Sequence, residues 1–241
     1  MIGKVKQISK LSIFFPAYNE EANLKWTVDG AIPTIKKYAK RYEIIIVNDG
    51  SKDKTLEMAL GLAKKYPFVR VINHKVNRGY GGALQSGLYG AKYPWIVFTD
   101  ADGQFDFGEL SVFLKEQQKT GADLVIGYYL KRQVSLIRKL GSFAWQVAVW
   151  LLFGLRVRDI DCGFKLIRKE VVDKISKLES ERGPFITSEL LIKAKRKGYK
   201  IVEVGVHHYP RMAGKATGAS LKVIWSGFAD LLRLRQKLSH V

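Results

Sequence analysis

Residues 95–105 read "WIVFTDADGQF", an apolar run that ends in two carboxylates and an amide. An unbroken apolar run of this kind is typical of a strand that is buried on both faces of a sheet. Asp100, Asp102 and Gln104 occupy alternate positions, so an extended chain would point all three to one side. The stretch predicts a buried strand with a cluster of oxygen ligands at its end.

The same pattern, a short apolar run followed by polar residues, recurs along the first half of the chain. Helix-like stretches separate the runs, and this alternation predicts a doubly wound α/β fold with a mostly parallel sheet and flanking helices. The expected strands are residues 11–15, 42–49, 68–74, 95–100 and 122–128, and the expected helices lie around residues 20–40, 53–66, 79–91 and 108–119.

The second half of the chain is more basic and then strongly apolar. Residues 159–206 are expected to add a strand and a helix, then a helix and a strand, and a polar loop with glycines follows at 207–220. The last segment repeats apolar residues at helical spacing. We expect one domain over residues 1–220 and a C-terminal amphipathic helix in residues 221–241.

The charge balance points to an anionic partner. Lys and Arg number 41 and Asp and Glu 22, which gives a net charge of +19. Such an excess favours nucleic acid, an anionic membrane surface or a phosphorylated substrate, and the alternative is a highly charged soluble surface. The single cysteine, Cys162, cannot form a disulfide within the chain and fits a reducing compartment. No signal peptide is expected, and the apolar residues 143–155 are shorter than the ~20 residues of a membrane span.

Polar motifs follow the other expected strands as well. They are "PAYNE" (residues 16–20), "NDGSKD" (48–53) and "NRGYGGA" (77–83). Because ligands of doubly wound sheets bind beyond the carboxyl ends of the strands, these motifs and residues 99–105 should share one site.

Each motif has a chemical interpretation and a plainer one. Two neighbouring carboxylates, Asp100 and Asp102, need a cation between them, and hard oxygen ligands suit Mg²⁺ or Mn²⁺; alternatively they form an Asp-Gly turn. Arg78 lies where a helix begins, a place that favours anions, or in a glycine-permissive turn. Asp49 can accept hydrogen bonds from a nucleoside, while Ser51 is expected to cap the next helix.

These motifs together resemble the donor-site motifs of family 2 glycosyltransferases, which have the GT-A fold. Within that family the chain is similar to the polyprenyl-phosphate sugar synthases, which include dolichyl-phosphate mannose and glucose synthases. The resemblance spans roughly residues 10–220 and is most specific in the first 110. It implies an inverting transfer of a hexose from a nucleotide sugar, of the GDP-mannose or UDP-glucose type, to a dolichyl or undecaprenyl phosphate.

The resemblance also implies roles for particular residues. Asp102, Arg138 and Arg211 would act in catalysis, and Asp100, Asp102 and Gln104 would bind Mg²⁺ or Mn²⁺ at the donor diphosphate. The full set expected to bind donor or acceptor is Pro16, Ala17, Tyr18, Glu20, Asp49, Arg78, Ser142 and Lys215.

The chain departs from the family pattern in two places. Asn48 stands where the first Asp of "DDGS" is commoner, and Tyr128 and Tyr129 stand where many relatives carry an arginine after the strand. The second departure leaves open which cation meets the acceptor phosphate. His207 and His208 are interpreted as packing within a loop or contacting substrate, rather than as metal ligands.

Three hypotheses for the function remain, and the first two differ in the acceptor of the sugar. A lipid phosphate is already anionic and needs no strong base, whereas a sugar or protein hydroxyl needs a carboxylate such as Asp161 or Glu189. A nucleic-acid-binding module is the remote alternative, although no RNA-binding signature is present and no nucleic-acid partner is expected. The favoured hypothesis predicts a peripheral enzyme on the cytoplasmic face of an anionic membrane, held by residues 143–155 and the last helix, unless these pack on the core or form a homodimer.

Overall fold

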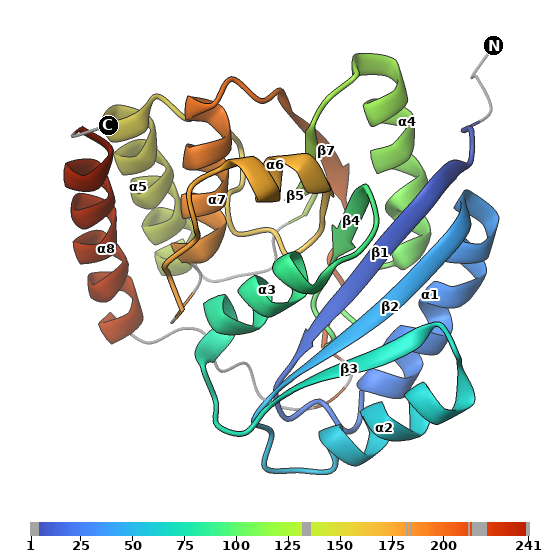
Figure 1. The fold of residues 1–241 in the computed structure, drawn as a ribbon. Coiled ribbons are helices and arrows are strands. Elements are labelled where there is room, and N and C mark those ends of the chain that lie inside the picture. The colour runs from blue at the N-terminus through green and yellow to red at the C-terminus, as the bar shows by residue number, and fades with distance from the viewer. Residues whose placement is uncertain are drawn as a thin grey trace.

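The computed structural model describes residues 5–131, 136–181, 183, 185–211, 213 and 221–239, and of residues 136–139, 221–226, 228 and 239 it describes the backbone (Figure 1). The strands are β1 (Ile8–Ala17), β2 (Ala39–Asp49), β3 (Val69–His74), β4 (Trp95–Phe98), β5 (Leu124–Tyr129), β6 (Lys165–Arg168) and β7 (Ile201–Val206). The helices are α1 (Leu24–Tyr38), α2 (Thr55–Lys65), α3 (Gly79–Gly90), the 3-10 turn η1 (Phe107–Glu109), α4 (Leu110–Thr120), α5 (Leu136–Phe153), α6 (Lys169–Lys174), α7 (Phe185–Arg196) and α8 (Leu221–Ser239).

The strands form one sheet in the order β3-β2-β1-β4-β6-β5-β7. β1 runs parallel to β2 and β4, β2 is parallel to β3, and β5 is parallel to β7, while β6 is antiparallel to both of its neighbours. The predicted doubly wound, mostly parallel sheet is confirmed. The carboxyl ends of β1 to β4 consequently meet at one edge.

Helices cover both faces of the sheet, as Figure 1 shows. One core cluster joins α1, α2 and α4 to the sheet, and the other joins α3, α5, α6, α7 and α8 to the opposite face. Side chains of β1 alternate between the two: Ile13 and Phe15 belong to the first cluster and Phe14 to the second. Burial on both faces explains why these strands are continuously apolar in the sequence.

The antiparallel strand β6 was not foreseen in its position. It pairs with β4 so that Lys165 lies opposite Phe98, the last residue of β4. Because the two strands run in opposite directions, the segment that enters β6 arrives at the edge where β4 ends. Residues 159–164 therefore border the carboxylates that follow β4.

The C-terminal helix packs onto the body of the molecule. Leu231 and Leu234 of α8 are buried in the second core cluster, and Gly227 lies against Trp145 of α5. The predicted helix is present, whereas its separation from a domain of residues 1–220 stays a prediction. No helix in the part of the chain that the structure describes is long and apolar enough to cross a membrane.

Candidate active site

The strand before the carboxylates ends earlier than predicted. β4 stops at Phe98, and the chain then turns, with Gly103 in the left-handed region at a φ of 74°. The side chain of Asp102 stabilises this turn, because its Oδ1 accepts a hydrogen bond from the Gln104 N–H at 3.1 Å. The expectation of an extended chain through Asp100 is wrong, and Asp100 and Asp102 meet different partners.

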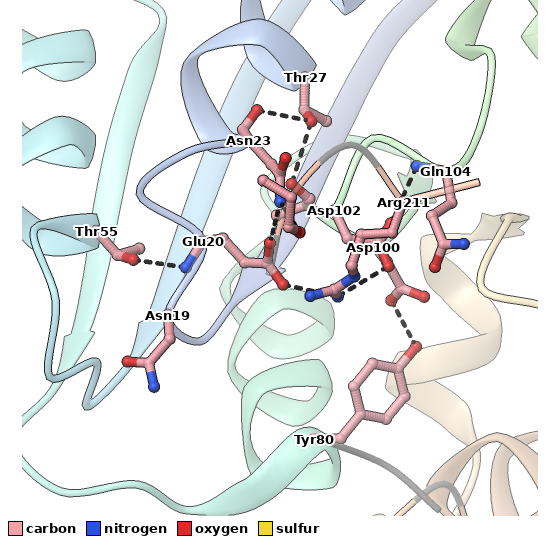
Figure 2. Close-up of polar contacts among 12 residues, drawn as sticks. Asn19, Glu20, Asn23, Thr27, Thr55, Tyr80, Asp100, Asp102, Gln104 and Arg211 are labelled. Carbon is pink, nitrogen blue, oxygen red and sulfur yellow. Dashed lines mark hydrogen bonds and ion pairs between the residues drawn. The ribbon is translucent and has the colours of Figure 1, made fainter. Parts of the chain in front are cut away.

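Asp100 faces the first turn of α3. Its Oδ1 accepts a hydrogen bond from the Tyr80 hydroxyl at 3.0 Å (Figure 2). Burial and the neighbouring charge of Asp102 raise the pKa of Asp100 to about 7, although the Tyr80 hydroxyl and the Lys165 ammonium oppose this. A buried carboxylate that is repelled by a neighbouring one is the kind of group that a bound cation stabilises in its charged form.

Asp102 meets an arginine from the segment after β7. Nη2 of Arg211 lies 3.1 Å from Asp102 Oδ2 and 2.9 Å from Glu20 Oε1, as Figure 2 shows. Burial raises the pKa of Glu20, while Asn23 and Arg211 act against the shift. The predicted residues Glu20, Asp102 and Arg211 therefore come together from three distant parts of the sequence.

Further hydrogen bonds join the segment after β7 to the site. Nε2 of Gln104 donates to the Tyr209 carbonyl at 2.9 Å, and the Tyr209 N–H donates to the Gln104 carbonyl at 2.9 Å. Nδ2 of Asn23 donates to the Ala213 carbonyl at 3.1 Å. Arg211 is thus placed over the carboxylates by backbone contacts on both sides of it.

Asp49 is the last residue of β2, and its carboxylate lies at the N-terminal end of α3. It is buried, and it accepts hydrogen bonds from the N–H groups of Arg78 (2.9 Å) and Gly79 (2.8 Å). Its Oδ1 is also 2.6 Å from Nδ1 of His74, whose Nε2 is 2.8 Å from Ser86 Oγ. This Asp–His–Ser chain was not recognised in the sequence. Its contacts tie β2, β3 and α3 together, and the predicted contact of Asp49 with a nucleoside stays a prediction.

The loops after β1 and β2 contact each other. Ser51 Oγ accepts a hydrogen bond from the Asn19 N–H at 3.0 Å, and Asn19 Oδ1 accepts one from the Lys52 N–H at 2.8 Å. Ser51 was expected to cap α2, but that helix begins at Thr55, and Asp53 rather than Ser51 accepts a hydrogen bond from the Thr55 N–H, at 3.0 Å, so the expectation is wrong. Ser51 instead binds the neighbouring loop.

The remaining predicted donor-side residues lie close by. Pro16 and Ala17 are buried at the end of β1, and Tyr18 is half-buried just beyond it. The Arg78 guanidinium pairs with Glu181 at 2.6 Å, so its contact with a phosphate stays a prediction.

Of the residues predicted to contact the acceptor, Ser142 is half-buried on α5. Arg138 belongs to α5, but its side chain lies outside the described residues, and so does Lys215 entirely. Of the two histidines, His207 is 2.6 Å from Glu109 and His208 packs edge-on against Tyr129. Both therefore have packing partners in the protein, and a contact with substrate stays a prediction.

The oxygen atoms of Asp100, Asp102 and Gln104 suit a hard divalent cation whose remaining coordination positions are filled by a diphosphate. Within the described ranges no group of three or more His, Cys, Asp or Glu side chains is arranged to hold a metal ion. Mg²⁺ and Mn²⁺ do not require such a cage, because one or two carboxylates, phosphate oxygens and water suffice. Here Asp102 and Glu20 already bind a cation, the Arg211 guanidinium.

Sequence reasoning missed two residues of this site. Tyr80 lies inside the "NRGYGGA" motif, which was interpreted through its glycines and Arg78 and not through the tyrosine hydroxyl. Lys165 is buried, and its ammonium donates to the carbonyls of Ile160 (3.0 Å) and Cys162. A lysine inside the apolar stretch "FKLI" is the sequence signal that could have identified it, since a lysine on a buried strand requires nearby acceptors.

The sheet order, the two helical layers and the carboxylates at the strand ends define a GT-A glycosyltransferase. A solved structure with this fold is glucosyl-3-phosphoglycerate synthase from Mycobacterium tuberculosis in complex with Mn²⁺, uridine diphosphate and glucosyl-3-phosphoglycerate, with a TM-score of 0.72 and 22% identity over 95% of this chain and 80% of that one. Residues 12–176 match the sequence profile of glycosyl transferase family 2. The chain belongs to this family.

The curated relatives include dolichyl-phosphate glucosyltransferases. Dolichyl-phosphate beta-glucosyltransferase of Homo sapiens is 33% identical over 248 residues, which cover 94% of this chain and 75% of the human protein. Dolichyl-phosphate beta-glucosyltransferase ALG5A from Trichomonas vaginalis is 34% identical over 208 residues, which cover 81% of this chain and 64% of that protein. The chain thus spans three quarters of the first relative and less than two thirds of the second.

Proposed function

We propose that this protein transfers glucose, with inversion, from UDP-glucose to a polyprenyl phosphate, and that it uses Mg²⁺ or Mn²⁺. The names of the curated relatives support a glucosyl donor and a lipid-phosphate acceptor. They give no support to the GDP-mannose alternative. The structural neighbour with bound Mn²⁺ and uridine diphosphate supports the cation and the nucleotide.

The contacts of Glu189 argue against one of the two carboxylates considered as a base for a hydroxyl acceptor. Its side chain is 2% exposed and pairs with Lys193 at 2.6 Å. It also accepts hydrogen bonds from the N–H groups of Glu179 and Ser180 at 2.9–3.1 Å. A carboxylate committed in this way cannot serve as the base that a hydroxyl acceptor needs. An acceptor that is already anionic, a lipid phosphate, fits better.

The site residues then divide the work. A bound cation would supply positive charge to the departing diphosphate, held by Asp100 and Asp102 with Gln104 beside them. Arg211 would exchange its carboxylate partners for phosphate oxygens, for which a guanidinium is well suited. The acceptor phosphate needs alignment rather than deprotonation, so positioning and charge provide most of the rate.

The direct test is transfer from radiolabelled UDP-glucose to polyprenyl phosphate with Mn²⁺, with GDP-mannose and a simple sugar acceptor in parallel. We expect lipid-linked glucose, no product in excess EDTA, and an unchanged rate for Asp161→Asn. Full activity in EDTA contradicts the cation. Transfer to the sugar acceptor that is lost in Asp161→Asn establishes the hydroxyl alternative, because Asp161 is half-buried and is the other carboxylate considered as a base.

The exposed face of α5 supports peripheral binding to the cytoplasmic face of an anionic membrane. Four large apolar side chains share this face and form the α5 stripe: Leu140 (68% exposed), Phe143 (64%), Trp150 (47%) and Leu151 (70%). The Arg156 guanidinium lies over the Trp150 ring, so a basic group borders the stripe. An exposed apolar row beside basic residues, on a chain of net charge +19, is suited to an anionic lipid surface.

Flotation with anionic vesicles tests this part separately. Phe143→Glu combined with Leu151→Glu should reduce flotation at low salt. The matched control is Leu60→Glu, which changes an equally apolar side chain, 55% exposed, on the distant helix α2. Equal flotation of all three proteins, or none of the wild type, contradicts the membrane surface. Gel filtration of the same variants tests the homodimer: conversion of a dimer to a monomer by the α5 changes would assign the stripe to a second copy.

A further inference from the structure

We propose that Tyr80 is a positioning residue for the cation–diphosphate site, which it serves by holding the Asp100 carboxylate in one orientation. The inference rests on the proposed function. The Tyr80 hydroxyl donates to Asp100 Oδ1 at 3.0 Å, and Figure 2 shows the ring below the carboxylate. Tyr80 does not need to contact substrate for this role, because it acts through Asp100.

The other side of Asp100 is closed by a glycine. A Cβ atom at Gly163 would lie 2.5 Å from Asp100 Oδ2 and 3.3 Å from Oδ1, so a larger residue there would displace the Asp100 carboxylate. The antiparallel strand β6 brings Gly163 to this place, and the buried Lys165 fixes the preceding turn by donating to Ile160 and Cys162. Asp100 therefore has a hydroxyl donor on one side and the Gly163 backbone on the other.

The backbone that carries Tyr80 is itself fixed. Residues 177–181, which we call the strap, pack against the first turn of α3 so closely that a Cβ at Gly81 would lie 2.3 Å from the Ser180 carbonyl oxygen. The Gly82 N–H donates to the Glu181 carbonyl at 2.8 Å. From the far side Glu189 and Lys193 of α7 bind the strap. The position of Tyr80 is thus set by the fold.

The two carboxylates of the site consequently have partners of different kinds. Asp100 is oriented by a neutral donor on a fixed helix, whereas Asp102 pairs with Arg211 on the segment after β7. A neutral O–H donor leaves the negative charge of the carboxylate available to a cation, while a guanidinium competes for it. Loss of an outer-shell partner that orients a metal ligand typically costs about 10–100-fold in metal affinity.

Isothermal titration calorimetry of Mn²⁺–UDP tests the role without turnover. Tyr80→Phe removes only the hydroxyl and should weaken binding about tenfold or more. UDP titrated in excess EDTA should bind Tyr80→Phe and the wild type alike. The control is Tyr89→Phe on the same helix, whose hydroxyl accepts from the Leu178 N–H of the strap at 2.8 Å and is not a partner of Asp100. It should bind Mn²⁺–UDP with wild-type affinity.

The outcomes separate this inference from the proposed function. A wild-type protein that does not bind Mn²⁺–UDP contradicts the proposed function itself. Wild-type binding with an unchanged affinity in Tyr80→Phe contradicts only the positioning role. Equal losses with and without Mn²⁺, or a melting temperature lower than that of Tyr89→Phe, would show that Tyr80 supports the fold alone.

Discussion

Two buried clusters of polar groups, one at each end of the parallel strands, each contain a carboxylate. The two clusters differ in how many hydrogen-bond donors they offer to it. On the side where β4 begins, Glu43 of β2 accepts hydrogen bonds from Ser12 Oγ (2.7 Å), Arg70 Nε (2.8 Å) and the Lys92 N–H (2.8 Å). On the side where β4 ends, Asp100 receives one hydroxyl and faces a second carboxylate.

The pKa values record the difference. Burial alone would raise the pKa of Glu43, but the donors from Arg70, Ser12 and Lys92 outweigh it, and the pKa is lowered. Burial and Asp102 instead raise the pKa of Asp100 to about 7. Burial of a charged group therefore does not mark an active site by itself. A buried carboxylate that lacks enough hydrogen-bond donors does indicate such a site, because a bound ligand must supply the missing positive charge or donors.

The largest expected effect breaks the site and spares the fold. Asp102→Ala should lower kcat about 1,000-fold, because removing a cation ligand forfeits several kcal/mol of stabilisation of the leaving diphosphate. The control is Asp106→Ala, which removes a carboxylate that accepts from the Gly108 N–H at 2.7 Å and caps η1. It should cost about 1 kcal/mol of stability and little rate. Equal rates in the two variants would contradict the role of Asp102.

The next effect concerns the arginine that pairs with two acids. Arg211→Ala should lower kcat/KM about 100-fold, and Arg211→Lys should recover part of the loss, because lysine keeps the charge but not the bidentate geometry. Arg233→Ala, which removes a surface partner of Asp230 on α8, serves as the control. An unchanged kcat/KM in Arg211→Ala would show that the segment after β7 takes no part in the reaction.

The sequence predicted the strands and the sheet edge because burial on both faces leaves continuous apolar runs. Through the family resemblance it also assigned Asp102, Glu20 and Arg211 to one site, although their direct pairing is seen only in the structure. It could not predict the antiparallel insertion of β6, since periodicity carries no information on strand order. For the same reason the closure of Asp100 by Gly163 and the commitment of Glu189 to the strap were hidden: both depend on contacts between segments distant in sequence.

A change in the Glu43 cluster should lower stability and leave the rate unchanged, the reverse of the effect expected for Asp102→Ala. Glu43→Gln should destabilise the fold by about 2 kcal/mol, the scale of a lost buried hydrogen bond to a charged group, and lower the melting temperature by about 4–8 °C. The activity of the folded protein should not change. Thermal melts and initial rates below the transition measure both quantities. A loss of rate without a loss of stability would mean that the two clusters are coupled.

The smallest expected effect is a pH dependence of the stability that Glu43→Gln loses. The pKa of Glu43 is lowered by folding, so its ion-pair contribution to stability is present above the unfolded-state pKa of about 4.3. It disappears as the pH falls through the lower folded-state value, because protonation then removes the charge from both states. The stability difference between wild type and Glu43→Gln should therefore be largest near pH 7 and shrink toward pH 3.

Urea denaturation at a series of pH values measures this difference. The control is Glu57→Gln, which changes an exposed carboxylate of α2 and should show little difference at any pH. A difference for Glu43→Gln that is constant with pH would show that the cluster stabilises the fold through packing and neutral hydrogen bonds. In that case the contrast with Asp100 would lie in donor count alone and not in charge.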